Sequence, residues 1–145
     1  MEKVIRKIQV IIFRKNPNLE ILMLKVIPER GGFWQCVTGK VEEGEDEVDA
    51  AFREVKEETG ISSDKVKHVL KDIYSFEYLK NNRKIHETVF GFEVFPDIVI
   101  DMTKNVYKEH TEYCWLSPEK AIAISSFDSQ KQSIIHLLNH GKRLC

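Results

Sequence analysis

The sequence predicts a mixed α/β (α+β) fold, in which helices pack on a mixed β-sheet. Segments rich in β-branched and aromatic residues stand on both sides of one amphipathic helix, and two further helical patterns close the chain. The 145 residues are 42% hydrophobic and include only 7 glycines and 4 prolines. This composition excludes collagen-like and disordered classes and predicts a single domain over residues 1–145.

The first half predicts three strands and one helix. Residues 7–13 and 19–26 form a pair of strands around a turn at 15–18, and residues 28–32 form a loop rich in helix and strand breakers. Residues 33–38 form a short strand, followed by a loop over 39–45. The helix covers residues 47–59, with Asp46 as its N-cap and Gly60 in the left-handed conformation that ends it.

The second half repeats this alternation. Residues 66–79 and 84–95 predict two strands joined by a hairpin at Asn81 and Asn82. A loop over 102–109 leads to a strand over 112–116, and Ser117 begins a helix. The last helix is predicted over 129–139, with Ile134, Leu137 and Leu138 inward and Gly141 beyond its end.

The helix over residues 47–59 carries two different stripes. Four apolar residues at i, i+3, i+4 and i+7 predict a buried stripe: Val48, Ala51, Phe52 and Val55. Three acids at i, i+3 and i+4 predict carboxylates crowded on one strip of surface: Glu54, Glu57 and Glu58. Such a strip is either a solvated charged face, with Arg53 compensating Glu57, or a site for Mg²⁺, which prefers a few carboxylates with water and phosphate oxygens.

The formal net charge of −1 hides a strong separation of charge. Residues 42–58 hold nine acids and two bases, a balance of −7, while the remainder holds 20 bases and 14 acids, a balance of +6. The pI of about 6.5 and the absence of a dense basic run indicate no nucleic-acid partner. No signal peptide or membrane span is recognisable, and three widely spaced cysteines predict reduced thiols in a cytoplasmic protein.

The spacing within residues 39–61 distinguishes between the two interpretations of the acidic strip. Nine positions match the pattern G-x5-E-x7-R-E-U-x-E-E-x-G-U, where U is aliphatic: Gly39, Glu45, Arg53, Glu54, Val55, Glu57, Glu58, Gly60 and Ile61. The chain therefore resembles the Nudix hydrolase family. The resemblance implies the Nudix fold, an α/β/α sandwich around a mixed β-sheet, and metal-dependent hydrolysis of a diphosphate linkage.

The resemblance also implies roles for individual residues of this motif. Glu54, Glu57 and Glu58 match the carboxylates that bind Mg²⁺, with Mn²⁺ as an alternative, and Gly39 matches the position whose carbonyl completes the metal shell. Arg53 matches the arginine that orients a neighbouring carboxylate.

Two other residues of the segment have less direct roles. Glu45 matches an auxiliary glutamate beside the helix, and Lys40 is placed to contact a phosphate. The likeness thus extends the catalytic group beyond the three helix carboxylates.

Residues outside the motif resemble one subgroup of this family. The segment F-W-Q-C-V-T-G over 33–39, the E-H pair at 109–110 and the W-L pair at 115–116 are similar to bacterial dihydroneopterin triphosphate pyrophosphatases, also described as dATP pyrophosphohydrolases. The likeness makes Glu109 the candidate for a distal metal ligand or general base, with Glu112 next. Trp34 and Gln35 become candidates for binding a ring, and three more aromatic residues are pocket candidates: Phe76, Tyr78 and Phe127.

The predicted substrate is a nucleoside or pterin triphosphate, cleaved to pyrophosphate and the monophosphate. Three alternatives stay open at this point. Tyr78 lies where diadenosine polyphosphate hydrolases carry a tyrosine, an enzyme that removes 8-oxo-dGTP would carry the same motif, and a nucleotide-sensing Nudix module would bind without hydrolysis. A homodimer is also compatible with the sequence.

Overall fold

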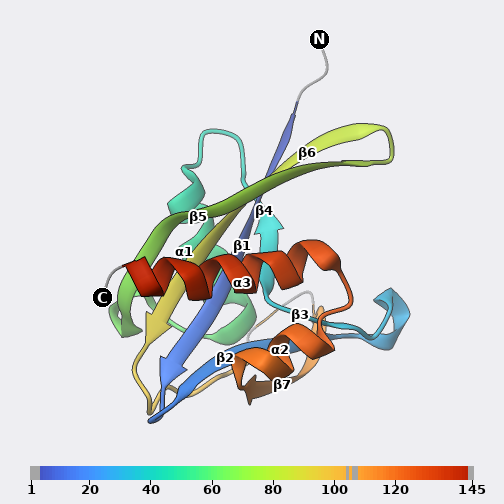
Figure 1. Ribbon diagram of the computed structural model, residues 1–145. Helices are drawn as coiled ribbons and strands as arrows, with labels where there is room; N and C mark the ends of the chain where they lie inside the picture. Colours follow the sequence, from blue (N-terminus) through green and yellow to red (C-terminus); the bar gives the residue numbers. More distant parts are fainter. Residues whose placement is uncertain (1–3, 104, 106–107, 144–145) are drawn as a thin grey trace.

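The computed structural model describes residues 4–103, 105 and 108–143. The strands are β1 Ile5–Lys15, β2 Leu19–Val26, β3 Trp34–Gln35, β4 Val37–Lys40, β5 Val66–Lys80, β6 Arg83–Val94 and β7 His110–Leu116. The α-helices are α1 Glu47–Thr59, α2 Pro118–Ile124 and α3 Asp128–Arg143, and two short 3₁₀ helices cover Pro28–Arg30 and Ser63–Lys65. Figure 1 shows their arrangement.

The strands form one mixed sheet in the order β3-β2-β1-β6-β5, with β4 also paired to β1 and β7 to β2. β1 and β6 are parallel, from Ile5↔Ile85 to Phe13↔Glu93, whereas the other pairs are antiparallel. β1 pairs with β4 in its first half and with β2 at its end, so these two partners diverge. The loop and helix α1 that follow β4 therefore begin near the middle of the sheet.

Helices cover both faces of this sheet. α1 packs on one face through Ala51 and Val55, which join a core that includes Ile8, Val10 and Phe92. α2 and α3 cover the other face, where Ala121, Ile134 and Leu137 join a second core (Figure 1). The predicted α/β/α sandwich around a mixed sheet is thus confirmed.

The ends of α1 follow the predicted pattern with one difference. Gly60 has a φ of 76° and donates its N–H to the Lys56 carbonyl, so the helix ends in the left-handed cap that a glycine permits. Asp46 occupies the N-cap position, but its side chain makes no capping hydrogen bond. Asn81 and Asn82 also have positive φ values, 53° and 63°, which confirms the hairpin tip.

Two predictions for the first half of the chain were wrong. The strand predicted over 33–38 is interrupted at Cys36, and Gly39 and Lys40, predicted in a loop, belong to β4 because they pair with Ile8 and Lys7.

The other two errors lie in the second half. β7 begins at His110, two residues before its predicted start. α3 continues through Gly141 to Arg143, because a glycine costs a helix only about 1 kcal/mol and packing can override that preference.

The structure describes two of the three cysteines, Cys36 and Cys114, and both are free thiols. Cys145 lies outside the described residues. Among the described helices, none combines the length and the apolar character needed to cross a membrane.

Candidate metal and active site

Arg53 of α1 holds the acidic motif together. Its Nε and Nη2 donate to the two carboxylate oxygens of Glu45, at 2.9 and 3.0 Å, and Nη2 also donates to the Lys40 carbonyl at 3.0 Å. Nη1 donates to Glu54 Oε1 at 3.0 Å and lies 3.5 Å from Glu57 Oε2. A planar guanidinium can make these contacts simultaneously, so one side chain fixes the loop after β4 against the helix.

Glu45 receives most of this interaction. Its Oε1 also accepts the backbone N–H of Glu42 at 3.0 Å. The hydrogen bonds from Arg53 hold the pKa of the Glu45 carboxyl below its usual value, so this carboxylate is ionised and already partnered. Its geometry suits a support for Arg53 better than a ligand for a metal.

Gly39 lies directly against Glu54. A Cβ built on Gly39 would stand 2.1 Å from the carboxyl carbon of Glu54, far inside van der Waals contact. Only a glycine therefore lets α1 bring this carboxylate against the backbone of β4. The close approach places the Glu54 carboxylate and the Gly39 backbone on one side of the site.

Glu58 was predicted on the helix surface and is instead buried, with 2% exposure. The spacing that defines the apolar stripe explains this correction: Glu58 follows Ala51 by seven residues, and two turns at 100° per residue return it to within about 20° of Ala51. Both carboxylate oxygens are buried, and neither has a hydrogen-bond partner in the described part of the chain. A buried carboxylate without partners is costly, and a bound cation would offset that cost.

Two consecutive residues complete the site beside Glu58: Glu109, just before β7, and His110, its first residue. Ligand atoms of Glu58, Glu109 and His110 all lie within 4.8 Å of one another. The Ile27 N–H donates to the Glu109 carbonyl at 2.9 Å, and Arg30 lies 3.5 Å from the Glu109 carboxylate. Glu109, predicted from the E-H pair, therefore lies beside the helix carboxylates, although α1 and β7 are far apart in the sequence.

His110 was missed as a site residue, although it is the second residue of the same pair. Its Nδ1 lies 3.7 Å from Glu58 Oε1, and the Gln35 side-chain amide donates to its Nε2 at 3.0 Å. Since burial lowers the pKa of His110, the neutral ring keeps its proton on Nδ1, facing Glu58. In this structure the side chain of Gln35, predicted to bind a ring of the substrate, contacts His110.

The carboxylates influence one another strongly. Burial raises the pKa of Glu54 to about 6, with Arg53 opposing the rise and Glu57 and Glu109 adding to it. Burial, followed by the charges of Glu54 and Glu109, raises the pKa of Glu58 well above its usual value. These are the conditions under which a divalent cation binds carboxylates, because its charge relieves desolvation and mutual repulsion together.

The predicted pocket residues fall into two separated groups. Trp34 forms an isolated bridge with Ser125, and Phe127 packs edge-on against Phe33 with centroids 5.1 Å apart. Phe76 and Tyr78 lie on β5 at the opposite edge of the sheet, where the Tyr78 hydroxyl donates to Glu87 at 3.0 Å. The structure therefore gathers Trp34 and Phe127 at one edge and excludes the other two from that group.

The two downstream acids are also distinguished by their surroundings. Glu112 is largely exposed, with its carboxylate 3.5 Å from the Lys25 ammonium, whereas Glu109 faces the buried cluster. Only Glu109 is placed to act together with the carboxylates of α1.

The chain belongs to the NUDIX domain family, whose model matches residues 5–138. A dihydroneopterin triphosphate diphosphatase of Haemophilus influenzae is 26% identical over 149 aligned positions, which cover 95% of this chain and 90% of that protein. An octanoyltransferase of Myxococcus xanthus is 28% identical over 120 positions, or 83% of this chain, but this chain spans only 32% of that protein.

Solved structures show the same fold. The Escherichia coli dihydroneopterin triphosphate pyrophosphohydrolase has a TM-score of 0.74 and 29% identity, over 89% of this chain and 91% of its own. A Caenorhabditis elegans Ap4A hydrolase has a TM-score of 0.80 and 22% identity, over 94% and 96% of the two chains. The family and these relatives identify a Nudix hydrolase that acts on phosphoanhydride bonds. Its homologues act on small-molecule nucleotides, and Nudix hydrolases generally use divalent metals.

Proposed function

We propose that this chain is a Mg²⁺-dependent pyrophosphohydrolase, with Mn²⁺ as an alternative ion, that acts on a nucleoside or pterin triphosphate. The substrate resembles dihydroneopterin triphosphate or dATP, and the products are pyrophosphate and the monophosphate. The observation that carries the proposal is the buried Glu58 carboxylate, which has two unpartnered oxygens among the described residues and lies beside Glu54, Glu57 and Glu109. The similarity to dihydroneopterin triphosphate diphosphatases supports the choice of substrate.

The donor set fits a hard divalent cation. Glu54, Glu57, Glu58 and the Gly39 carbonyl would hold it, because carboxylate and carbonyl oxygens are the ligands that Mg²⁺ prefers. When bound, the ion supplies charge neutralisation for phosphate oxygens and a more acidic water. Arg53 donates to both the Glu54 carboxylate and the Lys40 carbonyl of β4, and so holds these two groups at a fixed distance from each other.

The reaction adds water across one phosphorus–oxygen–phosphorus linkage. The water oxygen forms a bond to one phosphorus, the bridging oxygen leaves with the other phosphate, and the proton passes to a base. Glu109 is the candidate for that base, since its side chain is 35% exposed and lies beside the buried carboxylates. Lys40 would contact phosphate oxygens, and Trp34 and Phe127 would contact the ring, with Gln35 acting through His110.

A substrate panel tests the proposed function. The purified protein is incubated with Mg²⁺ and dATP, other nucleoside triphosphates, dihydroneopterin triphosphate and diadenosine tetraphosphate, with an EDTA control for each. We expect pyrophosphate and monophosphate from a triphosphate. ATP released from the diadenosine compound alone would favour the other hydrolase class, and no turnover of any substrate would refute an enzymatic role.

The role of Glu109 has a matched control in the neighbouring acid. Glu109→Gln should lower kcat about 10²- to 10⁴-fold, the range for loss of a general base. Glu112→Gln, which changes an exposed acid paired with Lys25, should leave kcat within about twofold. Equal losses in both variants, or full activity of Glu109→Gln, would exclude Glu109 as the base.

A further inference from the structure

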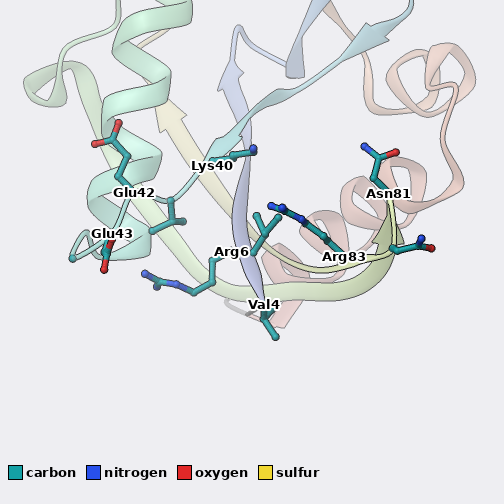
Figure 2. A pocket seen from close by; sticks show the side chains of 11 residues that line it. Val4, Arg6, Lys40, Glu42, Glu43, Asn81 and Arg83 are labelled. Carbon is teal, nitrogen blue, oxygen red and sulfur yellow. The ribbon is translucent and has the colours of Figure 1, made fainter. Parts of the chain in front are cut away.

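A basic cleft lies next to the carboxylate site, and of its cations only Lys40 has a role in the chemistry described so far. It has a volume of about 910 Å³ and lies between the first residues of β1, the loop after β4 and the β5–β6 hairpin. Figure 2 shows the Lys40 and Arg83 side chains on the side toward the β5–β6 hairpin, whereas Arg6 extends from β1 in the other direction, toward Glu42 and Glu43. A second hollow of about 490 Å³ shares Lys40 and Arg83 and adds Lys7 and Lys80, so the two hollows adjoin at the shared residues and are together called the basic cleft.

The cations of this basic cleft are largely available to a ligand. Among the described residues, no carboxylate lies within ion-pair distance of Lys7, Lys40, Lys80 or Arg83. Arg6 donates to the backbone carbonyl of Glu45, at 3.2 Å, and this contact leaves its positive charge without a carboxylate partner in the same part of the chain.

Lysines that merely protect a sheet edge would line up along one strand. Four of these cations instead line one hollow from three separate segments, β1, β4 and the β5–β6 hairpin, which is the arrangement that concentrates an anion: Lys7, Lys40, Lys80 and Arg83. Arg6 precedes Lys7 on the extended strand β1, so it points to the opposite face and lines the adjoining hollow. The two acids of the cleft, Glu42 and Glu43, lie on the wall formed by the loop after β4 (Figure 2).

The basic cleft is joined to the carboxylate site through β4. The Lys40 carbonyl accepts from Arg53, and the preceding residue, Gly39, touches Glu54. β3 lies at the other end of the segment over residues 34–40. There Gln35 contacts His110 and follows Trp34. Lys40 lies five residues after Gln35, about 17 Å at the usual rise of a strand. The carboxylate site thus lies between an aromatic end and a basic end.

We propose that the basic cleft binds the terminal phosphates of a linear polyphosphate, those beyond the linkage held at the carboxylates. The proposal rests on the proposed function and specifies the substrate class further: catalytic efficiency should rise from a triphosphate to a tetraphosphate. The first phosphates beyond the linkage would occupy the Lys40 side, and additional ones would reach Lys80 and Arg83 at the hairpin.

The kinetic test compares adenosine 5′-tetraphosphate with ATP in the intact protein with Mg²⁺. We expect a ratio of kcat/KM that favours the tetraphosphate. In the double variant Lys80→Gln/Arg83→Gln this ratio should fall about five- to tenfold, mainly through KM, because each exposed charge pair contributes modestly. Lys71→Gln, an exposed lysine of β5 outside the basic cleft, is the matched control and should leave the ratio unchanged.

A binding test separates this proposal from the proposed function. Inorganic tripolyphosphate is titrated by calorimetry into wild-type protein and into the double variant, in EDTA and at two salt concentrations. Binding that weakens in the double variant and with salt supports the basic cleft even if no nucleotide is hydrolysed. Equal binding to both proteins, no binding to the wild type, or an unchanged tetraphosphate ratio would overturn the proposal, while hydrolysis of triphosphates could still be intact.

Discussion

Replacing Glu58 by glutamine should stabilise the protein when no metal is present. Glu58 is 2% exposed, and both of its carboxylate oxygens lack partners among the described residues. Since its pKa is raised well above the usual value, the folded protein keeps a proton on Glu58 at pH values where the unfolded chain has released it. Folding in this range takes up a proton, and therefore the free energy of unfolding falls as the pH rises.

The size of this effect follows from the linkage of protons to folding. Below the ordinary glutamate pKa both states are protonated, and Glu58 contributes no pH dependence. Above it, each pH unit lowers the free energy of unfolding by about 1.4 kcal/mol, until the pKa of the folded state is reached. A glutamine at this position does not titrate, so the advantage of Glu58→Gln over the wild type should grow by about 1.4 kcal/mol per pH unit above the ordinary glutamate pKa, for as long as Glu58 stays protonated in the folded protein.

Urea unfolding in EDTA, monitored by tryptophan fluorescence at several pH values, measures this difference. Glu57→Gln is the control, because its side chain is 48% exposed and its replacement should change stability by no more than about 0.5 kcal/mol. Saturation with Mg²⁺ to about 100 times its Kd should stabilise the wild type by about 2.7 kcal/mol and Glu58→Gln by less. A Glu58→Gln protein that is less stable than the wild type above about pH 6 without metal would refute the reasoning.

Two other substitutions test the contacts that position the carboxylates. Gly39→Ala places a methyl group 2.1 Å from the Glu54 carboxyl carbon and should lower kcat by about tenfold or more, measured by steady-state kinetics, with an unchanged circular dichroism spectrum. Arg53→Lys keeps the charge but cannot bind Glu45 with two parallel hydrogen bonds, so it should cost about 1–3 kcal/mol in urea unfolding and reduce kcat. Wild-type kinetics in either variant would show that the contact does not position the site.

Local patterns were sufficient to predict most of the fold. The position of α1 follows from its apolar spacing and from Gly60, and the hairpin follows from Asn81 and Asn82. The burial of Glu58 was also encoded in that spacing, because it lies seven residues after Ala51. The charge of Glu58 favours an exposed position, but its place on the helix directs it to the buried face, and the place on the helix prevails.

Other features of the site depend on contacts between distant segments. Gln35 and His110 meet because β3 and β7 both pair with β2, and no local pattern specifies that pairing. The inclusion of Gly39 and Lys40 in a strand depends on their pairing with β1. Sequence reasoning could therefore name Glu109 but could not show that His110 and Gln35 belong to the same cluster.

The near-zero net charge results from acidic and basic residues that lie in different parts of the structure. The acidic segment surrounds one side of β4, while the bases of the basic cleft approach from β1 and the β5–β6 hairpin on the other. Without metal, the basic cleft attracts a polyphosphate and the carboxylates repel it. Binding should therefore occur without hydrolysis: tripolyphosphate should bind in EDTA, but no anhydride should be cleaved. A divalent cation reverses the sign of the carboxylate side, and the two halves of the site then attract the same anion.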